Sequence, residues 1–453
     1  MARSSTSRNA AAGVLLTALA GLAACGDQLP VSPRAEQPAF ARGGPTAGNP
    51  TVTSTTPASA TRNVTLSVTV SGSGFDAGSR AVWALQGDST LATTKIRTNS
   101  TTYVSSKKLT ANITVGSDAP LEKFDVLVLT AGGKKGIGIE LFAVTLEILD
   151  LGAGDGSSAE AVNDAGQIVG RGGPGAGAYL WENGVIRDLG VLPGMTWGSG
   201  EDINSSGQVV GYSSNADGSV YHAFLWTAAG GMQQLPGSLG GCCTMALSIN
   251  DLGMISGQAK RADGTTHAVV WENGVMRDVQ SFDSGSTFSW DLTNAGLVVG
   301  QWNLGGAGFA WSGAGGMRVL AGLEGPDDIP IGANDNGQIV GWYKRLQTDT
   351  RLKAFLWENG VIRDLGTLGG LSSVAWAINN AGTVVGRSDI GTTKQGGTIH
   401  HAFTWTAADG MKDLGSIVGR QWAQATALNE TGWVVGQTWL SSGESRATLW
   451  RLK

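Results

Sequence analysis

The chain contains few residues whose types and spacing could perform catalysis. Asp327 and Asp328 form an adjacent acidic pair, and paired carboxylates are what a glycan-cleaving enzyme needs, but nothing nearby supplies a second catalytic group. The sequence has no nucleophile elbow, no metalloprotease helix motif and no phosphate-binding loop. We therefore expect no catalytic residue, no metal site and no cofactor, and we keep a polysaccharide hydrolase or lyase as the alternative function.

Histidine and cysteine also give no recognisable site. His222, His267 and His401 occupy one position of an internal repeat, each directly before Ala. A zinc site needs its ligands to converge on one point, whereas equivalent positions of different repeats lie apart, so we interpret these histidines as solvated strand starts or hydrogen-bond caps. Cys242 and Cys243 are adjacent and too few for a closed zinc site. We interpret them as two reduced or locally bridged thiols in a loop.

The repeat is the most informative feature of the sequence. An Asn-x-x-Gly segment and an apolar run ending in Gly recur seven times, with Thr once in place of Asn, beginning at Asn163, Asn204, Asn250, Thr293, Asn334, Asn379 and Asn429. Each is followed by a run that ends in tryptophan, at Trp181, Trp226, Trp271, Trp311, Trp357, Trp405 and Trp450. Asn side chains bond nearby backbone and Gly takes the positive φ of a tight hairpin, so turn chemistry explains the Asn positions better than catalysis does. The tryptophans are best explained as packing between repeats.

Each repeat predicts four short strands in about 45 residues, which is the size of a propeller blade. The last repeat ends without a fourth strand, but the segment 146–152 (LEILDLG) matches that strand and precedes the first repeat. Pairing this segment with the last repeat would complete seven blades and remove exposed sheet edges. We predict an all-β chain in which residues 146–453 form a seven-bladed β-propeller closed by this segment.

The residues before the propeller have three parts. A basic start with Arg3 and Arg8, followed by a short apolar run to residue 24, predicts a signal peptide over 1–24. Residues 25–50 are rich in Pro, Gly and Ala and predict a flexible linker. Residues 51–145 contain alternating Val- and Thr-rich runs such as VTLSVTV and FDVLVLT, which predict a small antiparallel sandwich.

The amino-acid composition excludes some kinds of partner and some classes of protein. The 453 residues carry a formal charge of −5 and only 15% are charged, which argues against nucleic acid because such binding depends on neutralising phosphates with Lys and Arg. Glycine is abundant, at 70 residues, but has no three-residue period, so the chain is not collagen-like. No other apolar stretch is long enough to span a bilayer.

Loop lengths suggest which side of the ring binds a ligand. Strands alternate in direction, so the short Asn-x-x-Gly and Glu-Asn-Gly turns share one side, which we call the turn face. The longer, variable connections share the other side, which we call the loop face, and variable loops on a rigid scaffold commonly carry binding. The residue after each repeat's second conserved Gly would lie there: Arg171, Tyr212, Gln258, Gln301, Trp342, Arg387 and Gln437. Four loop tryptophans join them: Trp197, Trp302, Trp422 and Trp439.

These eleven residues are our predicted ligand-binding set, because aromatic faces and planar polar groups suit sugar rings and peptides. The alternative is that each side chain covers a strand end singly, which is common on protein surfaces. Trp290 and Trp376 fall within first strands, where we expect them to belong to the core.

Three segments of the chain resemble known families or signals. The HAFLW string of residues 222–226, DLGTLGG at 364–370 and the AIN-x-x-G-x-VVG units resemble the HAF-type extracellular repeat family. Segments VSGSGF, FDV and GIELF within 51–145 resemble the TIG/IPT immunoglobulin-like family, and LAAC at 22–25 resembles a lipoprotein processing site. The last implies a lipid on Cys25; the other reading of this segment is an ordinary signal peptide with an incidental cysteine.

Together these features predict an exported, monomeric protein at the outer membrane or cell surface, held to the membrane only by the lipid on Cys25. We expect a non-catalytic binding or adhesion module for a glycan or an extracellular or envelope protein, with no nucleic-acid partner.

Overall fold

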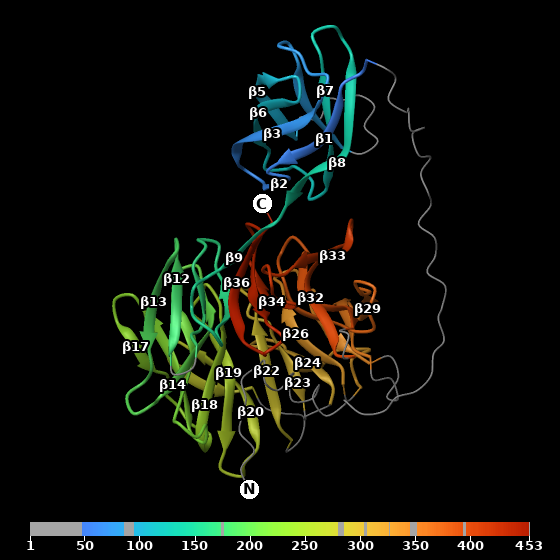
Figure 1. Cartoon of the computed structure of the whole chain (residues 1–453). Coiled ribbons are helices and arrows are strands. Elements are labelled where there is room, and N and C mark those ends of the chain that lie inside the picture. The colour runs from blue at the N-terminus through green and yellow to red at the C-terminus, as the bar shows by residue number, and fades with distance from the viewer. Residues whose placement is uncertain are drawn as a thin grey trace. The chain divides into compact units, whose positions relative to one another are not determined.

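The computed structural model describes residues 48–85, 95–173, 176–279, 285–302, 306–325, 327–344, 351–392 and 396–452. Regular structure in these residues consists entirely of β-strands, which confirms the prediction of an all-β chain. None of them belongs to a helix that could cross a bilayer. The described residues divide into two compact units, 48–147 and 148–452 (Figure 1). The predicted signal peptide, Cys25 and nearly all of the predicted linker lie outside the described residues.

The first unit contains two four-stranded sheets. One has the order β1 (Thr51–Thr56), β3 (Thr65–Ser73), β6 (Lys108–Val115) and β5 (Ile96–Ser105). The other has the order β2 (Ser59–Thr61), β8 (Lys135–Thr145), β7 (Lys123–Leu129) and β4 (Arg80–Leu85).

Alternation along these strands buries one face of each sheet. In β6 every second residue is buried, including Leu109 and Ile113. Trp83 and Phe142 meet edge to face, with ring centroids 6.0 Å apart, in the core between the sheets. The strands of this unit run from Thr51 to Thr145.

The second unit contains seven four-stranded antiparallel sheets, numbered here in chain order. The first three sheets are β10 (Ser158–Val162), β11 (Ile168–Arg171), β12 (Ala178–Glu182), β13 (Val185–Gly190); β14 (Trp197–Ile203), β15 (Val209–Ser214), β16 (Tyr221–Thr227), β17 (Gly231–Gln234); and β18 (Gly240–Ile249), β19 (Ile255–Arg261), β20 (Thr266–Glu272), β21 (Val275–Asp278). Sheets 4 and 5 are β22 (Thr287–Leu292), β23 (Val298–Trp302), β24 (Gly308–Ser312), β25 (Gly316–Val319); and β26 (Ile329–Ala333), β27 (Ile339–Tyr343), β28 (Lys353–Glu358), β29 (Val361–Asp364). Sheets 6 and 7 are β30 (Ser373–Ile378), β31 (Val384–Thr392), β32 (Thr398–Thr406), β33 (Gly410–Gly415); and β34 (Trp422–Leu428), β35 (Trp433–Trp439), β36 (Ser445–Arg451), β9 (Glu147–Asp150).

The sheets pack face to face around a ring. The second strand of each sheet contacts the first strand of the next, and β35 of sheet 7 contacts β10 of sheet 1. Apolar clusters lie between consecutive sheets: Val169 and Leu180 of sheet 1 pack with Phe224 and Trp226 of sheet 2. The unit is therefore propeller-like, and its core is divided among the interfaces between sheets.

The two ends of the unit meet in sheet 7. There β9 lies beside β36, as the match of 146–152 to a fourth strand predicts (Figure 1). Just beyond β9, the amide of Leu151 donates to the carbonyl of Ala447 at 3.0 Å. The Ser157 hydroxyl accepts the Ala447 amide at 3.0 Å, so hydrogen bonds on both sides of Ala447 join the two ends.

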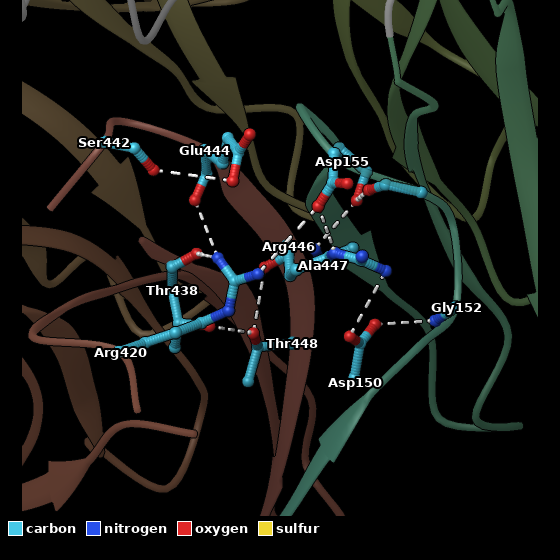
Figure 2. A network of polar contacts seen from close by, with 12 residues as sticks. Asp150, Gly152, Asp155, Arg420, Thr438, Ser442, Glu444, Arg446, Ala447 and Thr448 are labelled. Atoms are coloured by element: carbon cyan, nitrogen blue, oxygen red, sulfur yellow. Dashed lines mark hydrogen bonds and ion pairs between the residues drawn. The ribbon is translucent and has the colours of Figure 1, made fainter. Parts of the chain in front are cut away.

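Charged side chains surround this junction (Figure 2). Nε of Arg446 donates to Oδ1 of Asp155 at 2.7 Å, and its guanidinium lies 3.6 Å from Asp150. Arg420 donates to the carbonyl oxygens of Glu444 and Thr438 at 2.7 and 3.2 Å. The polar contacts thus connect β9 and the turn after it to the last strands of the chain.

Each repeat has two glycines, and each position requires glycine for a different physical reason. The turn glycine has a positive φ, for example +79° at Gly166 and +77° at Gly337, as its turn position predicts. The second glycine ends the apolar run, as at Gly170, where an added Cβ would lie 2.1 Å from the Ser158 carbonyl oxygen. The first strand has a β-bulge there, between Ala159 and Ala161, and brings its backbone too close for a side chain.

Candidate functional site

The Asn of each repeat bonds both its own turn and the next sheet. In sheet 1, Oδ1 of Asn163 accepts the amide of Gln167 at 3.0 Å, as the predicted turn requires. Its Nδ2 also donates across the interface to the carbonyl of Asn204 in sheet 2, at 3.0 Å. In the described residues the same inter-sheet bond is made by six Asn side chains: Asn163, Asn204, Asn250, Asn334, Asn379 and Asn429. These side chains therefore join neighbouring sheets, a role that turn chemistry alone does not predict.

The fourth repeat carries Thr293 in place of Asn and keeps only half of this pattern. Its Oγ1 accepts the Leu297 amide at 3.2 Å, but a threonine has no side-chain amide to donate to the carbonyl of Asn334 in sheet 5. The residues that follow the Asn positions form a second set of bonds between sheets. The Ser205 amide donates to Asp251 at 2.8 Å, and the Glu430 amide donates to Asp164 at 2.9 Å.

These turns surround a cavity of about 220 Å³ at the centre of the ring. Its lining comes from all seven sheets and includes six carboxylates: Asp164, Asp202, Asp251, Asp291, Asp335 and Glu430. None of the described residues that line it is Lys, Arg or His. The cavity opens on the turn face, whereas loop lengths favour the loop face as the binding side.

Three polar side chains stand together at one side of this cavity. Oγ of Ser248 lies 2.8 Å from Oδ2 of Asp202 and 3.1 Å from Oδ1 of Asp291. Burial raises the pKa of Asp202 to about 6 and the charge of Asp291 adds to this, against the Ile249 amide, which lowers the pKa. We did not predict this group from the sequence. The sequence does contain a sign of it: three successive repeats have a polar residue two places before the Asn position, where the other repeats have Ala or Gly.

The predicted loop-face ring is mostly an interface between sheets. Tyr212, Gln301, Trp342 and Gln437 are at most 9% exposed, while Arg171, Gln258 and Arg387 are half-buried. Several reach the first strand of the next sheet: Trp342 meets Trp376 edge to face with ring centroids 5.6 Å apart, and Gln258 donates to the carbonyl of Ser289 at 3.2 Å. The seven side chains therefore do not form an exposed ring, because the position after the second conserved glycine points into the interface between sheets.

Three members of the predicted set, Arg171, Trp197 and Tyr212, form a continuous group with two residues that we did not predict, Tyr221 and Lys260. Side chains from sheets 1, 2 and 3 lie next to one another in the order Arg171, Trp197, Tyr212, Tyr221 and Lys260. Arg171 lies 5.7 Å from the Trp197 ring centroid, and Lys260 lies 5.6 Å from that of Tyr221. The ring centroids of Trp197 and Tyr212 are 5.4 Å apart, and those of Tyr212 and Tyr221 are 6.2 Å apart. We call these five residues the aromatic row.

The aromatic row has buried middle members and accessible ends. Tyr212 and Tyr221 are buried, whereas Arg171, Trp197 and Lys260 are half-buried. A cation over an indole or phenol face is stabilised by the ring's electrostatic field, so this arrangement holds two cations at the loop face. The adjacent Cys242 and Cys243 form a disulfide beside it, with Cys243 buried against the tyrosines and Cys242 exposed. Of the two states left open for these thiols, the structure has the bridged one.

The remaining loop tryptophans lie elsewhere and are also half-buried. Nε1 of Trp422 donates to the carbonyl of Thr398 at 2.7 Å, and Trp439 meets His400 edge to face, with ring centroids 5.9 Å apart. Burial, together with nearby Arg387, lowers the pKa of His400 to about 3. Trp302 is half-buried against the core between sheets 3 and 4. The predicted set is thus divided between separate places on the ring.

Both tryptophans that we expected in first strands lie there. Trp376 is buried in β30, as expected, whereas Trp290 in β22 is only half-buried. The seven tryptophans that end third strands are all buried, and in sheet 2 Trp226 packs against the apolar side chains of sheet 1, as predicted. Arg187 of sheet 1 covers that indole, 4.9 Å from its ring centroid.

Two of the three repeat histidines, His267 and His401, act as hydrogen-bonding groups within single sheets. Nδ1 of His401 lies 2.8 Å from Asp413, and Nδ1 of His267 lies 3.0 Å from Asp278. This agrees with the expected cap role, but His267 is buried, not solvated, because its strand start is covered. No three His, Cys, Asp or Glu side chains converge as metal ligands would in the part of the chain that the structure describes.

The vicinal acids are both occupied in structural contacts. Oδ2 of Asp327 pairs with Nζ of Lys344 at 2.8 Å, and Oδ2 of Asp328 accepts the Gly325 amide at 2.7 Å. Burial raises the pKa of Asp328. The Asp327 carboxylate is therefore held by a lysine and the Asp328 carboxylate by a backbone amide. Neither contact is that of a catalytic acid–base pair.

Comparison with known proteins identifies no family. No protein-family model and no curated protein matches this chain. Among solved structures, the chain is similar to virginiamycin B lyase from Staphylococcus aureus, at 12% identity over 67% of this chain and 98% of that chain, with a TM-score of 0.44. It is also similar to a Mycobacterium tuberculosis puromycin-hydrolyzing peptidase, at 11% identity over 76% of this chain and 57% of that chain, with a TM-score of 0.41. These likenesses carry no function over to this chain.

Proposed function

We propose that this chain is an exported, lipid-anchored binding or adhesion module whose loop face engages a glycan or an extracellular or envelope protein. In this proposal the second unit is a seven-bladed propeller of HAF-type repeats, and the first unit is an immunoglobulin-like spacer of the TIG/IPT kind. Cys25 carries the lipid, and no catalytic residue, cofactor or nucleic acid takes part.

The aromatic row is the observation that supports this proposal best. Three sheets contribute to it, so a ligand resting on it would contact a rigid surface and not a single loop. The half-buried Trp197 indole offers an apolar face, and Arg171 and Lys260 at the two ends offer hydrogen-bond donors. Sugars and extended peptides combine apolar ring or side-chain faces with polar edges, which this surface complements.

A glycan array and a panel of envelope proteins test the proposal directly. The wild-type protein should retain a subset of ligands, and the double variant Arg171→Ala/Lys260→Ala should lose them, as should Trp197→Ala. The matched control is Leu252→Ala, which removes an exposed apolar side chain from the turn face. Retention of every ligand by the folded loop-face variants, or loss in the Leu252→Ala control, would contradict the assignment of the loop face.

The same panel addresses the alternative function. A polysaccharide hydrolase or lyase would release soluble products during incubation, and Asp327→Asn or Asp328→Asn would abolish the release. The structural contacts of both acids favour the binding proposal. The lipid anchor has a separate test, because Cys25→Ala should shift the protein from the membrane fraction to the soluble fraction of the secreting cell.

A further inference from the structure

The group of Asp202, Ser248 and Asp291 joins three consecutive sheets on the turn face. Asp202 belongs to β14, Ser248 to β18 and Asp291 to β22. The single hydroxyl lies between the two carboxylates, at 2.8 Å from one and 3.1 Å from the other. A hydroxyl has one proton to donate, so it can satisfy only one carboxylate oxygen at a time. With both acids ionised, one of these two close contacts lacks a hydrogen.

Backbone amides donate the other hydrogen bonds that the two carboxylates accept. Asp202 accepts the Ile203 and Ile249 amides, both at 2.8 Å. Asp291 accepts the amides of Leu292 and Ala333, both at 2.9 Å. Each carboxylate is thus held in place by an amide of its own strand and by an amide of the next sheet. Their separation is set by the backbone, and repulsion between them cannot be relieved by a simple side-chain rotation.

The other charged groups among the described residues that line this cavity are all acidic. They are Asp164 after β10, Asp251 after β18, Asp335 after β26 and Glu430 after β34. Each accepts a backbone amide from a neighbouring turn: that of Glu430, Ser205, Ala295 and Asn380, respectively. Burial raises the pKa of Asp251, but the bonds from Ser205 and Asn294 outweigh it and lower the pKa overall. No Lys, Arg or His is among the described lining residues to offset the negative charge of these carboxylates.

We propose that Asp202, Ser248 and Asp291 bind one additional proton between them, which makes this seam a pH-sensitive junction of sheets 2, 3 and 4. A hydronium ion transfers its proton to Oδ2 of Asp202 and leaves as water, and the new O–H group donates to Oγ of Ser248. The serine hydroxyl then donates to Oδ1 of Asp291, so every close contact has a hydrogen. The charge of the two carboxylates together changes from −2 to −1. Both contacts of Ser248, with Asp202 and with Asp291, are therefore hydrogen bonds only in mildly acidic solution.

Electrostatics supports the direction of this change. Burial raises the pKa of Asp202 to about 6, against an ordinary value of 3.8. Because the folded pKa lies above the unfolded one, the proton stabilises the fold below the unfolded value and this stabilisation is lost as the pH rises through about 6.

Infrared difference spectroscopy of the full chain between pH 4.5 and 7.5 tests the proposal, because a protonated carboxyl has a carbonyl band that imidazole lacks. We expect one such band to be lost with a midpoint near pH 6. Asp202→Asn should remove it, and Asp291→Asn should lower its midpoint by removing the neighbouring charge. Asp251→Asn, which alters an acid of the same cavity outside the group, should leave the midpoint unchanged.

A wild-type protein with no carboxyl band above pH 5 would overturn the proposal, and so would a band unchanged in both Asp202→Asn and Asp291→Asn. Ser248→Ala keeps both acids and provides a check if an Asp variant fails to fold. Loss of the bridging hydroxyl should shift the midpoint by a measurable fraction of a pH unit, and an unchanged midpoint would count against a shared proton.

Discussion

The side-chain amide of Asn429 donates a hydrogen bond of 2.9 Å to the carbonyl oxygen of Asn163, which lies 266 residues earlier in the chain. This bond connects the last sheet to the first. It has the same form as the bond from Asn163 to Asn204 in the next sheet, which shows that the closing interface is built like the others. The asparagine that joins neighbouring sheets in the other repeats therefore also closes the ring.

Replacing Asn429 with Ala should weaken the closing interface. The change removes the acceptor of the Trp433 amide and one of two donors to the buried Asn163 carbonyl, which keeps the Gly166 amide at 3.0 Å. We expect a loss of about 1–3 kcal/mol in the free energy of unfolding, the cost of one unsatisfied buried group, measured by chemical denaturation. A loss below about 0.5 kcal/mol would show that the bond is not important for closure.

Thr293→Asn is the opposite test at the one position where the inter-sheet bond is missing. An asparagine there can keep the bond to the Leu297 amide and also donate to the Asn334 carbonyl. The expected gain is about 0.5–1.5 kcal/mol in the free energy of unfolding, the usual net value of one hydrogen bond. A destabilised variant would mean that this interface cannot accommodate the amide.

Ser256→Val should stabilise sheet 3. The Ser256 hydroxyl is buried and has no hydrogen-bond partner in the described structure, while the other six repeats have valine at this position. Replacing an unsatisfied hydroxyl with an apolar group removes its desolvation cost of about 1–3 kcal/mol and adds buried apolar area. Thermal unfolding should show a higher Tm than wild type. Ser256→Ala is the matched control, with a smaller gain, and a lower Tm for the valine variant would contradict the prediction.

At the junction shown in Figure 2, the neutral contact should matter more than the ion pair. Ser157 is fully buried and accepts the Ala447 amide, so Ser157→Ala should cost about 1–3 kcal/mol. Asp155 is 55% exposed, and exposed ion pairs contribute about 0–1 kcal/mol, so Asp155→Ala should cost less. Denaturation of both variants in low and high salt gives the comparison. A larger loss in the free energy of unfolding for Asp155→Ala than for Ser157→Ala in high salt would contradict this prediction.

His400 should make the protein less stable in acid. Its folded pKa of about 3 lies below the ordinary value of 6.5, so the unfolded chain binds the proton more readily in between. The stability present above pH 6.5 therefore falls as the pH decreases toward 3, by at most about 1.4 kcal/mol per pH unit. His400→Phe should flatten this part of the stability curve. An unchanged slope would show that the histidine does not titrate as its burial implies.

The repeat pattern allowed much of this architecture to be predicted. Turn glycines such as Gly166, the buried tryptophans and the pairing of β9 with β36 follow from local rules and from counting strands. The inter-sheet role of Asn163 did not follow, because its partner carbonyl lies in the next repeat and one sequence does not state how repeats face each other.

The candidate site was harder to predict for the same reason. Trp342 and Tyr212 follow the second conserved glycine of their repeats, and their burial comes from side chains of the adjoining sheet, such as Trp376 beside Trp342, which one repeat does not reveal. The aromatic row depends on loops and strands from three sheets, so its members are separated in sequence by up to 89 residues between Arg171 and Lys260. The acid pair with Ser248 was visible only as a departure from the small residues of other repeats.

Native-state amide hydrogen exchange at Leu151 tests ring closure most directly, and the assignment of turns and loops to opposite faces depends on that closure. We expect the Leu151 amide, bonded to the Ala447 carbonyl, to exchange as slowly as interior strand amides and to become fast in a chain shortened before Ala447. Exchange at the rate of an unstructured amide in the intact protein would contradict a closed ring.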